Sequence, residues 1–461
     1  MKILYIGAGF VGSCSAAVAA NSGHNTLLYD IDENKIKKLT SCDRDTIESC
    51  LFEDGLGDIL VRNKERICFT TDYRKVEDFL SDCDAVFMCL PTPEIGETGE
   101  SNLSYFYDAL DKVSQALKKR NGGKQGKYVL VVNKSTVPID TADQTKEKLE
   151  KAGVKNFGVA SNPEFLVEGK AIQGSIKPDR IVVGAWTEKD FNIMRQIYQR
   201  FYDSPSVKYI EVTPQEAAAG KLLANFYLFN KLAVCFDTIG RTCETFAGLK
   251  FENVRNILSS DNRIGEWGFY NSLYAGGSCF IKDSRSLAHQ LQSKNKNAAL
   301  VNETCVANKR QLEIFVGRAE KEAGFDWQGK KVAILGLAFK RDTNDIRNAA
   351  AAELMGLILS KKSKEIVVYD PVAMENFKQL FPSSDVVKYA LSEAEAVKDA
   401  DVVVIAADWP QFRGLAEIIV LLKKKPLIMD GRRMLQHKYD ELQEKGCNII
   451  AVGSQFLKGK N

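Results

Sequence analysis

Residues 2–12 have the sequence KILYIGAGFVG, a short apolar run that leads into three glycines. The run at 2–6 predicts a buried strand, the small residues at 13–21 predict a helix, and residues 25–29 predict a second strand. A GxGxxG sequence between the strand and the helix of such a βαβ unit is typical of dinucleotide-binding folds. The sequence therefore predicts an α/β fold with a parallel, doubly wound Rossmann-type sheet.

The glycine turn itself is expected to bind the dinucleotide. Glycine allows a tight turn and lets the backbone approach a pyrophosphate closely, and the N-terminus of the following helix attracts the negative charge. The predicted contacts are Gly7, Gly9, Phe10, Val11 and Gly12.

An acidic residue, Asp30, ends the second predicted strand. Its carboxylate is expected to accept hydrogen bonds from the adenosine ribose and to repel a 2′-phosphate, so NAD is favoured over NADP as the cofactor. Lys35 follows, and it is either a contact of the pyrophosphate or ribose or a surface residue of the next helix. A flavin site or an incomplete dinucleotide fold is the alternative interpretation of the whole motif.

Two later turns each follow an apolar strand candidate. They read Leu90-Pro91-Thr92-Pro93 and Lys134-Ser135-Thr136-Val137-Pro138. Ligands of open α/β sheets bind outside the carboxyl ends of the strands. We therefore expect Pro91, Thr92, Ser135 and Thr136 to contact the cofactor, although prolines also simply end strands.

The order of elements divides the chain into three predicted domains. Residues 1–212 form the NAD-binding domain, 213–324 a helical domain whose apolar faces predict a dimer interface, and 325–461 a second Rossmann-like α/β domain. A charged segment, 118–127, predicts a surface loop. The further strand candidates are 85–90, 128–132, 158–160, 181–184, 331–335, 366–369, 402–406, 427–429 and 448–452, and the long helical stretches are 215–258 and 302–323.

The composition restricts the classes of protein. The chain has 461 residues, of which 45% are hydrophobic and 27% charged, and a formal net charge of +3. This balance calls for neither nucleic acid nor a membrane as a partner, and no apolar run approaches the ~20 residues that span a bilayer. Eleven cysteines without a CxxC pair predict no disulfide framework and no metal site. With no predicted signal peptide, we expect a cytoplasmic protein.

One cysteine lies in a segment suited to covalent chemistry. Residues 276–283 read Gly276-Gly277-Ser278-Cys279-Phe280-Ile281-Lys282-Asp283. The glycines let the backbone approach a ligand, and a nearby cation favours the thiolate, which is the form that attacks carbon. Taken alone, the segment also fits a packed, unreactive thiol beside a turn.

Further segments complete a pattern. Glu164 and Glu168 are four residues apart and share a face if that segment is helical, and Lys221 and Asn225 have the same spacing. Together with the runs 162–166 (NPEFL), 276–280 (GGSCF) and 336–340 (GLAFK), they closely resemble the UDP-glucose/GDP-mannose dehydrogenase family. The resemblance covers nearly the whole chain.

The resemblance implies an NAD-dependent, four-electron oxidation of a nucleotide sugar at C6, with UDP-glucose converted to UDP-glucuronate and two NAD+ consumed. The alcohol becomes an aldehyde, then a thiohemiacetal and a thioester on Cys279, and water releases the acid. The alternatives within the family are UDP-N-acetylhexosamine and GDP-mannose. The alternatives from other classes are a two-electron hydroxy-acid dehydrogenase and an NAD-binding protein without enzyme activity.

The resemblance also implies a role for each residue. Cys279 is the nucleophile, Lys221 stabilises negative charge on the C6 oxygen with Asn225 as a second donor, and Glu164 is a general acid/base that acts through water. Thr136 and Asp283 are the implied holders of that water, and Glu168 and Arg347 the implied further cofactor contacts. The implied substrate contacts are Glu164, Phe165, Leu166, Lys221, Asn225, Arg263, Tyr270, Tyr274, Gly276, Phe339, Lys340 and Arg432, with Arg263 reaching the site of a neighbouring subunit of a homodimer or higher oligomer.

Several positions depart from the family's pattern, among them Ile281, the loop 94–100 and the two residues before the paired glycines. Tyr274 and Ala275 precede the paired glycines where the family has glycine followed by an aromatic residue. Because Tyr274 replaces a glycine, we expect a different backbone shape at this point. In the last domain, the turn 336–338 lacks the second and third glycines of a dinucleotide loop, which favours a UDP-sugar site over a second NAD site.

Overall fold

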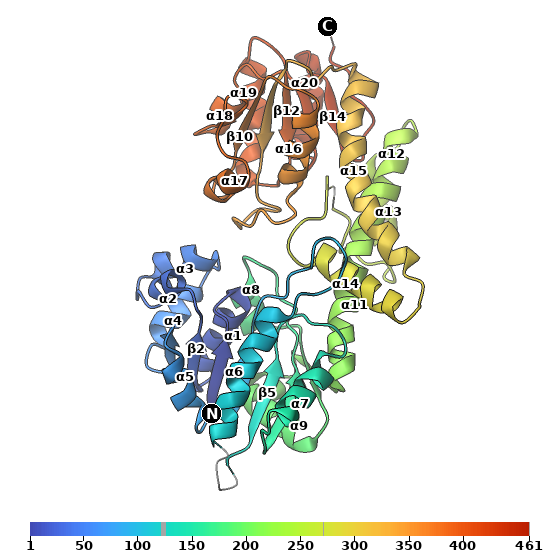
Figure 1. The fold of residues 1–461 in the computed structure, drawn as a ribbon. Coiled ribbons are helices and arrows are strands. Elements are labelled where there is room, and N and C mark those ends of the chain that lie inside the picture. The colour runs from blue at the N-terminus through green and yellow to red at the C-terminus, as the bar shows by residue number, and fades with distance from the viewer. Residues whose placement is uncertain (121–125, 271, 461) are drawn as a thin grey trace. The chain divides into compact units, whose positions relative to one another are not determined.

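The computed structural model describes residues 1–120, 126–270 and 272–460. Its contacts divide the chain into two compact units, Met1–Ala224 with Ser286–Lys296 and Asn225–Arg285 with Asn297–Asn461, and each is described by itself. Both units contain a β-sheet with helices on its two faces (Figure 1), which confirms the predicted α/β class. The boundaries predicted at 212 and 324 stay a prediction.

Among the described residues, the sheet of the first unit has the strand order β3-β2-β1-β4-β5-β6-β7-β8. Neighbouring strands are parallel except β6 and β7, which pair antiparallel, so the predicted parallel sheet is confirmed with one antiparallel pair that the sequence did not predict. The strands are β1 (Lys2–Ile6), β2 (Asn25–Tyr29), β3 (Ile67–Thr70), β4 (Ala85–Met88), β5 (Val129–Asn133), β6 (Phe157–Ser161), β7 (Arg180–Ala185) and β8 (Lys208–Val212).

The reversal of β7 has a local cause. The chain that leaves β6 stays near the end of that strand, because the buried carboxylate of Glu53 accepts hydrogen bonds from the backbone of Gly169 (2.8 Å) and Ala171 (2.7 Å). The short helix α8 (Ala171–Ile176) then leads directly into β7. The strand runs antiparallel to β6, and its last residues, Gly184 and Ala185, pair with Ser161 and Ala160 at the end of β6.

Alternate residues of the strands pack on opposite faces of this sheet. Ile3 and Tyr5 pack with α1 (Phe10–Asn21), whereas Leu4 and Ile6 pack with α5 (Tyr73–Leu80). The first face also carries α2 (Glu33–Leu39), α3 (Arg44–Leu51), α4 (Leu56–Arg62), α8, α9 (Glu188–Ile197) and α10 (Gln199–Tyr202), and the second carries α6 (Ser104–Arg120) and α7 (Thr141–Lys151). Half of the charged segment 118–127 predicted as a loop, residues 121–125, lies outside the described residues, and residues 118–120 belong to α6.

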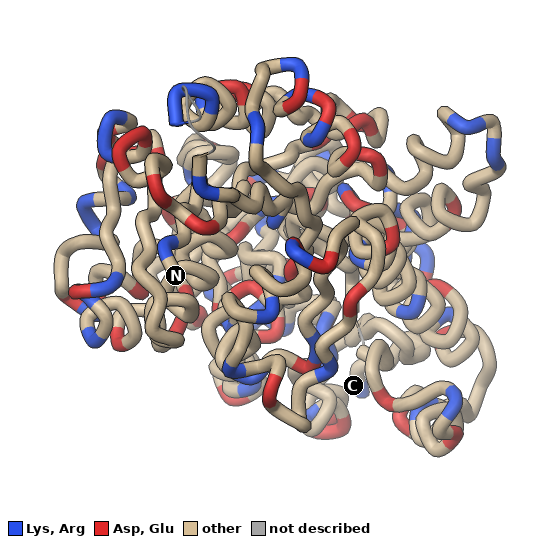
Figure 2. The backbone as a smooth tube through the Cα atoms, turned by 90° about the horizontal axis from the view of Figure 1, so that it is seen from below, with Lys and Arg blue, Asp and Glu red and all other residues tan. Residues whose placement is uncertain are grey.

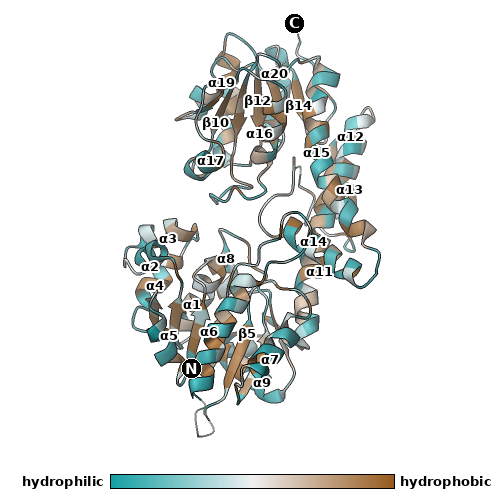
Figure 3. Ribbon diagram, in the orientation of Figure 1, coloured by the Kyte–Doolittle hydropathy of each residue, from teal (hydrophilic) through white to brown (hydrophobic). Residues whose placement is uncertain are grey.

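The second unit contains a parallel sheet with the order β11-β10-β9-β12-β13-β14 within its described residues. Its strands form the apolar centre of the unit in Figure 3. They are β9 (Lys331–Leu335), β10 (Glu365–Tyr369), β11 (Val387–Tyr389), β12 (Val402–Ile405), β13 (Leu427–Asp430) and β14 (Ile449–Ala451). One face packs with α15 (Ala299–Ala323), α16 (Ala350–Ser360) and α17 (Met374–Leu380), and the other with α18 (Glu393–Val397), α19 (Leu415–Leu421) and α20 (Tyr439–Glu444).

The predicted helical stretch between the sheets is present, and one part of it differs from expectation. Helix α11 (Pro214–Ala233) continues through a π-helical turn, η1 (Val234–Gly240), into α12 (Arg241–Thr245). This continuous run is long and apolar enough, by length and composition alone, to cross a membrane, and 33% of its apolar window is buried. The sequence reading missed it because Lys221 and Lys231 interrupt the apolar pattern. The helices α13 (Phe251–Ser259) and α14 (Phe280–Ser293) follow.

Acidic and basic residues are interspersed along the backbone (Figure 2). This mixture agrees with the small formal net charge of +3.

Close packing on β7 gives a test of the fold. A Cβ atom at Gly184 would lie 2.6 Å from Cα of Pro214 and 2.7 Å from the carbonyl oxygen of Thr213. We expect Gly184→Ala to destabilise the protein by about 1–3 kcal/mol, because backbone must move to make room. The melting temperature measures this effect.

The matched control for this substitution is Gly220→Ala. A Cβ atom there meets no atom within 4 Å, and alanine favours a helix interior by up to ~1 kcal/mol. Equal melting temperatures for the two variants would contradict the packing of β7 against the start of α11.

Candidate active site

The glycine turn follows β1, and two of its glycines are required by the protein itself. Gly7 has φ of +104°, and a Cβ atom there would lie 2.3 Å from the carbonyl oxygen of Cys89. A Cβ atom at Gly12 would lie 1.9 Å from the carbonyl oxygen of Gly7. At Gly9, by contrast, a Cβ atom would meet no described atom within 4 Å. The packing of the protein therefore does not require glycine here, but a side chain would obstruct a ligand that approaches the backbone.

Helix α1 starts at the predicted contacts Phe10 and Val11. Its N-cap, Gly9, makes no side-chain capping hydrogen bond, and its first turn contains no acidic residue. The backbone N–H groups at the helix N-terminus are therefore suited to an anion, and the turn fits the pyrophosphate of a dinucleotide.

Asp30 lies directly after β2 and connects the glycine turn to the next helix. Its Oδ2 accepts hydrogen bonds from the backbone N–H of Ala8 (2.7 Å) and from Nζ of Lys35 (3.1 Å). The carboxylate is thereby fixed at the glycine turn, where an adenosine ribose would be recognised. The same contact brings Lys35 to this site and not to a distant surface.

The structure also brings the two later turns together. The hydroxyl of Thr92 donates a hydrogen bond to the carbonyl oxygen of Thr136 (2.7 Å), and the hydroxyl of Ser135 donates one to the carbonyl oxygen of Leu90 (2.6 Å). Pro91 is exposed beside them. Because β4 and β5 are parallel neighbours, both turns lie at the carboxyl edge of the sheet.

A buried ion pair lies at the end of β6. Nζ of Lys221 on α11 is 3.7 Å from Oε1 of Glu164, and these residues are only 3% and 9% exposed. Oε2 of Glu164 accepts a hydrogen bond from the backbone N–H of Leu166 (2.8 Å). The Phe165 ring lies between two cations, 4.0 Å from the guanidinium carbon of Arg180 and 5.3 Å from Nζ of Lys221.

The segment that contains Glu164 and Glu168 is not helical, so the predicted shared helix face is wrong. Residues 162–167 have no helical structure, and Glu168 lies in a turn. Pro163 disfavours a helix at Asn162, and the side chain of Glu164 bonds the backbone two residues ahead. The two carboxylates therefore do not share a helix face.

Sequence reasoning missed Glu53, which anchors this loop from a distance. Its carboxylate, 0% exposed, binds the backbone N–H groups of Gly169 and Ala171. The only local signal is an acidic residue next to Phe52 in an irregular stretch, and that pattern does not identify a partner more than a hundred residues away.

In the second unit, Cys279 lies at the start of α14. Its carbonyl oxygen accepts the backbone N–H of Asp283 (2.8 Å), and its Sγ is 3.5 Å from the hydroxyl of Ser278. The thiol is half-buried. The N-terminus of a helix stabilises a negative charge, so this position favours the thiolate.

A buried carboxylate one turn into α14 is bonded on both sides. Oδ2 of Asp283 accepts a hydrogen bond from the amide of Asn225 (2.6 Å), and Oδ1 pairs with Nζ of Lys282 (2.6 Å). The structure thus brings together Asn225 and Asp283, which lie far apart in the sequence. Asp283 orients the amide of Asn225.

The paired glycines of the cysteine segment pack against the loop that follows β9. A Cβ atom at Gly276 would lie 2.3 Å from the carbonyl oxygen of Asn348, and one at Gly277 would lie 3.0 Å from the ring of Phe339. The backbone N–H of Gly277 donates to the carbonyl oxygen of Arg347 (3.1 Å). The cysteine segment and the predicted substrate contact Phe339 are therefore neighbours.

Arg432, a predicted substrate contact, follows β13 on the same unit. Its guanidinium donates to the hydroxyl of Ser272 (2.9 Å) and pairs with Asp408 (2.9 Å). Burial is the largest single influence on the pKa of the Asp408 carboxyl, and it raises that pKa. The cation of Arg432, together with hydrogen bonds and the cation of Arg341, outweighs burial and holds the pKa below its usual value.

The segment around Tyr274 packs into the second unit, and the different backbone shape expected there stays a prediction. Tyr274 is not among the described residues with positive φ, and its side chain is buried in the core of the second unit. The amide of Asn308 holds Ala275 from both sides: its Oδ1 accepts the Ala275 N–H (2.8 Å), and its Nδ2 donates to the Ala275 carbonyl (3.1 Å). Asn308 is a second residue that sequence reasoning missed.

The remaining predicted contacts of the second unit are more exposed. The Arg263 side chain is 88% exposed and pairs with Asp261 (2.6 Å), and Tyr270 is also exposed. Arg347 pairs with Asp345 (2.6 Å), and Nζ of Lys340 lies 5.7 Å from the centre of the Phe339 ring.

The second Rossmann-like sheet has an aspartate at the position that Asp30 occupies in the first. Asp370 follows β10, but it is 1% exposed and its oxygens accept hydrogen bonds from other protein groups. The donors are the backbone N–H groups of Leu337, Ala338, Val372 and Ala373 and the indole N–H of Trp409. Asp370 is thus a structural residue with little capacity left for a ribose, which supports the expectation that this sheet does not bind a second NAD.

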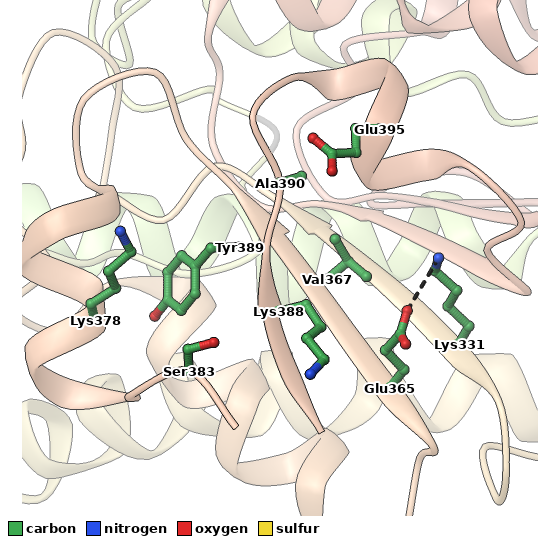
Figure 4. Close-up of a pocket in the computed structure, with 9 residues that line it drawn as sticks. All are labelled: Lys331, Glu365, Val367, Lys378, Ser383, Lys388, Tyr389, Ala390 and Glu395. Atoms are coloured by element: carbon green, nitrogen blue, oxygen red, sulfur yellow. Dashed lines mark ion pairs between the residues drawn. The ribbon is translucent and has the colours of Figure 1, made fainter. Parts of the chain in front are cut away.

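Of two cavities in the structure, one is lined by predicted site residues and the other is not. In the first unit, a cavity of about 80 Å³ is lined by Glu164, Phe165 and Leu166 together with other residues around the end of β6. In the second unit, a cavity of about 560 Å³ beside β10 and β11 (Figure 4) is lined by none of the predicted site residues, and Lys331 and Glu365 form an ion pair there. Within the described residues, no group of three metal-ligating side chains lies together.

The glycine turn, Asp30 and the α/β sheet define an NAD-dependent dehydrogenase. Residues 1–202 match the NAD binding domain of the UDP-glucose/GDP-mannose dehydrogenase family, residues 215–310 its central domain and residues 333–437 its UDP binding domain. The chain belongs to this family. The family assignment and the NAD cofactor inferred from the sequence are therefore confirmed.

Named relatives share nearly the full length of the chain. UDP-glucose 6-dehydrogenase of Rickettsia felis is 33% identical over 458 residues, 99% of this chain and 97% of the relative. UDP-glucose 6-dehydrogenase AglM of Haloferax volcanii is 33% identical over 448 residues, 95% of this chain and 98% of the relative. The structure of a UDP-glucose dehydrogenase from Pyrobaculum islandicum superposes with a TM-score of 0.84 at 29% identity and covers 95% of both chains.

Asp30 gives a test of the cofactor site. We expect Asp30→Asn to weaken NAD binding about tenfold or more, because a charge-assisted acceptor is lost beside the glycine turn. Titration of NAD against protein fluorescence measures the dissociation constant.

Asp32→Asn is the control, because Asp32 caps α2 through the Lys35 N–H and asparagine caps a helix equally well. Unchanged NAD affinity in Asp30→Asn would refute the role of Asp30.

Proposed function

We propose that this protein oxidises the C6 alcohol of UDP-glucose to the carboxylate of UDP-glucuronate in two successive two-electron steps. The observation that carries the proposal is the thiol of Cys279, held at a helix N-terminus on a glycine turn that packs against Phe339 of the matched UDP binding domain. The named relatives support glucose as the sugar.

The proposed reaction balances through a covalent intermediate on Cys279. In the first oxidation, C6 loses one hydrogen with two electrons, and its hydroxyl proton leaves to the solvent through Glu164 and water. The thiolate then forms a C–S bond to the aldehyde carbon while the carbonyl oxygen takes up a proton, which gives a thiohemiacetal. C6 loses its second hydrogen with two electrons and the hydroxyl loses its proton, which gives a thioester. Water adds to the thioester carbon and the C–S bond breaks, which releases the acid, returns the thiolate and gives one proton to the solvent.

Bound NAD+ supplies the acceptor for the two electrons and one hydrogen removed from C6 in each oxidation. The residues that would hold it are the glycine turn, Asp30, Lys35 and the turns with Pro91, Thr92, Ser135 and Thr136, with Glu168 and Arg347 as further proposed contacts.

The charged residues are proposed to stabilise the negative charge that develops on the C6 oxygen. Lys221 supplies a cation, and its buried surroundings strengthen that interaction. Asn225 supplies a neutral donor in an orientation fixed by Asp283. Glu164 moves the proton, and Thr136 and Asp283 position the water through which it acts.

The proposed UDP-sugar contacts in the second unit carry positive charge or an aromatic ring. Lys340 and Arg432 would neutralise the diphosphate, and Phe339 would pack against the ligand. Phe165, Leu166, Arg263, Tyr270, Tyr274 and Gly276 complete the proposed substrate contacts.

Product stoichiometry tests this proposal. With UDP-glucose limiting and NAD+ in excess, we expect two NADH per sugar, because the thioester route carries out both oxidations before release. UDP-N-acetylhexosamine and GDP-mannose, supplied separately, should react more slowly. One NADH per sugar would identify a two-electron dehydrogenase, and NAD binding without turnover on any of these sugars would identify a protein without this activity.

The matched variants are Cys279→Ser and Cys243→Ser. Cys279→Ser should lose acid formation by at least about a thousandfold, because a hydroxyl is a far weaker nucleophile than a thiolate. Cys243 is buried in a separate cluster, and its replacement should leave the stoichiometry at two. Retained acid formation in Cys279→Ser would contradict the thioester.

We further propose that the protein is a homodimer or a higher homo-oligomer. Large apolar side chains are exposed on the helices of the second unit and on the turns next to them. They include Tyr227 and Ile257 (both 72% exposed), Leu300 (66%) and Phe246 (61%). A set of this kind marks a surface that another protein surface covers. Such an interface between subunits would cover the apolar run that includes α11 without a membrane. The free cysteines agree with a cytoplasmic protein.

Light scattering tests the oligomer. The wild-type protein should have a mass at least about twice 51.3 kDa, and Ile257→Glu should shift it toward the monomer because a charge is then buried in the interface. Leu391→Glu is the control, since Leu391 is 90% exposed but lies outside the helical segment. A fully active wild-type monomer would refute the interface.

A further inference from the structure

One irregular loop of the first unit carries three of the proposed substrate contacts. It connects β6, which ends at Ser161, with α8, and Glu164, Phe165 and Leu166 lie near its middle. Residues 162–167 belong to neither a helix nor a strand. Such a segment keeps one conformation before the ligand arrives only if other parts of the protein hold it, because ordering an irregular chain costs conformational entropy.

The start of this loop is held by the side chain of Asn162, which is 1% exposed. Its Oδ1 accepts hydrogen bonds from Nζ of Lys134 (3.0 Å) and from the hydroxyl of Tyr198 (2.6 Å). Its Nδ2 donates to the carbonyl oxygen of Val182 (2.8 Å). The loop is therefore fixed to the sheet where it leaves β6.

The end of the loop is held by Glu53, which lies in the turn between α3 and α4 and is 0% exposed. One carboxylate oxygen, Oε1, accepts the backbone N–H of Gly169 (2.8 Å), and the other, Oε2, accepts that of Ala171 (2.7 Å). Hydrogen bonds to an ionised carboxylate are stronger than those between neutral groups. Glu53 thus fixes both the last part of the loop and the first residue of α8.

The turn that carries Glu53 has a defined shape of its own. Phe52 has φ of +54° and Gly55 has φ of +81°, and Oε1 of Glu48 accepts the backbone N–H of Gly55 (3.1 Å). A left-handed conformation is unfavourable for a bulky residue and persists only where the surroundings stabilise it. The turn also packs on α8, since a Cβ atom at Gly55 would lie 3.6 Å from Cγ2 of Ile172.

We propose that Glu53 is a positioning residue for the nucleotide sugar, which holds the loop in the conformation in which Phe165 and Leu166 meet the substrate. Because Glu53 is 0% exposed, it acts through the backbone of Gly169 and Ala171 and not by contact with a ligand. The proposal rests on the proposed substrate contacts of this loop.

Loss of the Glu53 hydrogen bonds should affect one kinetic constant more than the other. If the loop adopts its binding conformation only part of the time, the apparent dissociation constant of the substrate rises by the inverse of that fraction. The KM for UDP-glucose then rises, whereas the complex that has formed reacts at nearly the same rate. The glycine turn and Asp30 lie outside the loop, so most of the NAD site is unaffected.

Glu53→Gln tests this proposal, because an amide offers one acceptor oxygen and turns an N–H group toward the second backbone donor. At saturating NAD+, we expect the KM for UDP-glucose to rise about tenfold or more and kcat to change less than about threefold. The dissociation constant of NAD should change less than about threefold. Hydrogen exchange, measured by mass spectrometry, should be faster in the peptide 164–172 of the free protein and slow again with UDP-glucose bound.

Asp54→Asn is the matched control. Asp54 is the next residue, is exposed, and accepts only a longer hydrogen bond from the Gln173 amide (3.3 Å), which asparagine can also accept. Its kinetic constants and its hydrogen exchange should equal those of the wild type. Glu53→Asp keeps both acceptor oxygens on a shorter side chain, so its KM should lie between the wild-type value and that of Glu53→Gln. It replaces Glu53→Gln if the latter does not fold.

Phe165→Ala separates the possible failures. A purely structural Glu53 would lower kcat by reducing the folded fraction and would leave both KM values unchanged, and this result would overturn the proposal. So would unchanged hydrogen exchange in the loop. If Phe165→Ala raises the KM for UDP-glucose but Glu53→Gln does not, the substrate site stands and the role of Glu53 is overturned. If the wild-type protein does not oxidise UDP-glucose, the proposed function is overturned as well.

Discussion

The parallel direction of β1 through β6 is the constraint on which the chemistry of the first unit depends. Parallel neighbouring strands end at the same edge of a sheet. Residues that are far apart in the sequence but directly follow these strands therefore lie at one edge. The glycine turn follows β1, Asp30 follows β2, and the turn that contains Ser135 and Thr136 follows β5. The antiparallel strand β7 also meets this edge, because its last residues pair with the last residues of β6, and its first residue, Arg180, lies against the Phe165 ring.

The second sheet repeats this framework with a different use of the same positions. An aspartate again ends the strand next to the first, yet Asp370 is closed off by backbone and indole donors. The aspartate proposed to recognise a ribose in the first sheet thus has a counterpart in the second sheet that stabilises a turn. The second unit has two other features that suit a ligand. Arg432 supplies a cation at the end of β13, and the cysteine segment packs against Phe339.

Patterns within a few residues predicted the fold well. The strands 2–6, 25–29 and 331–335 occur with the predicted bounds, because an apolar run closed by glycine or aspartate is a strong local signal. The helical spacing assumed for Glu164 and Glu168 failed, because contacts from Glu53 shape that loop and they are invisible to local periodicity. The part of Asn162 in holding this loop was missed for the same reason, because a sequence shows neither burial nor tertiary partners.

Covalent capture of the substrate on Cys279 is the central claim of the proposed mechanism. The most direct measurement is the intact mass of Glu164→Gln after reaction with UDP-glucose and NAD+, since slow hydrolysis should let the thioester accumulate. The account predicts a mass increase equal to one UDP-glucuronyl group, located on the peptide that contains Cys279. A protein of unchanged mass that nevertheless releases UDP-glucuronate would contradict it.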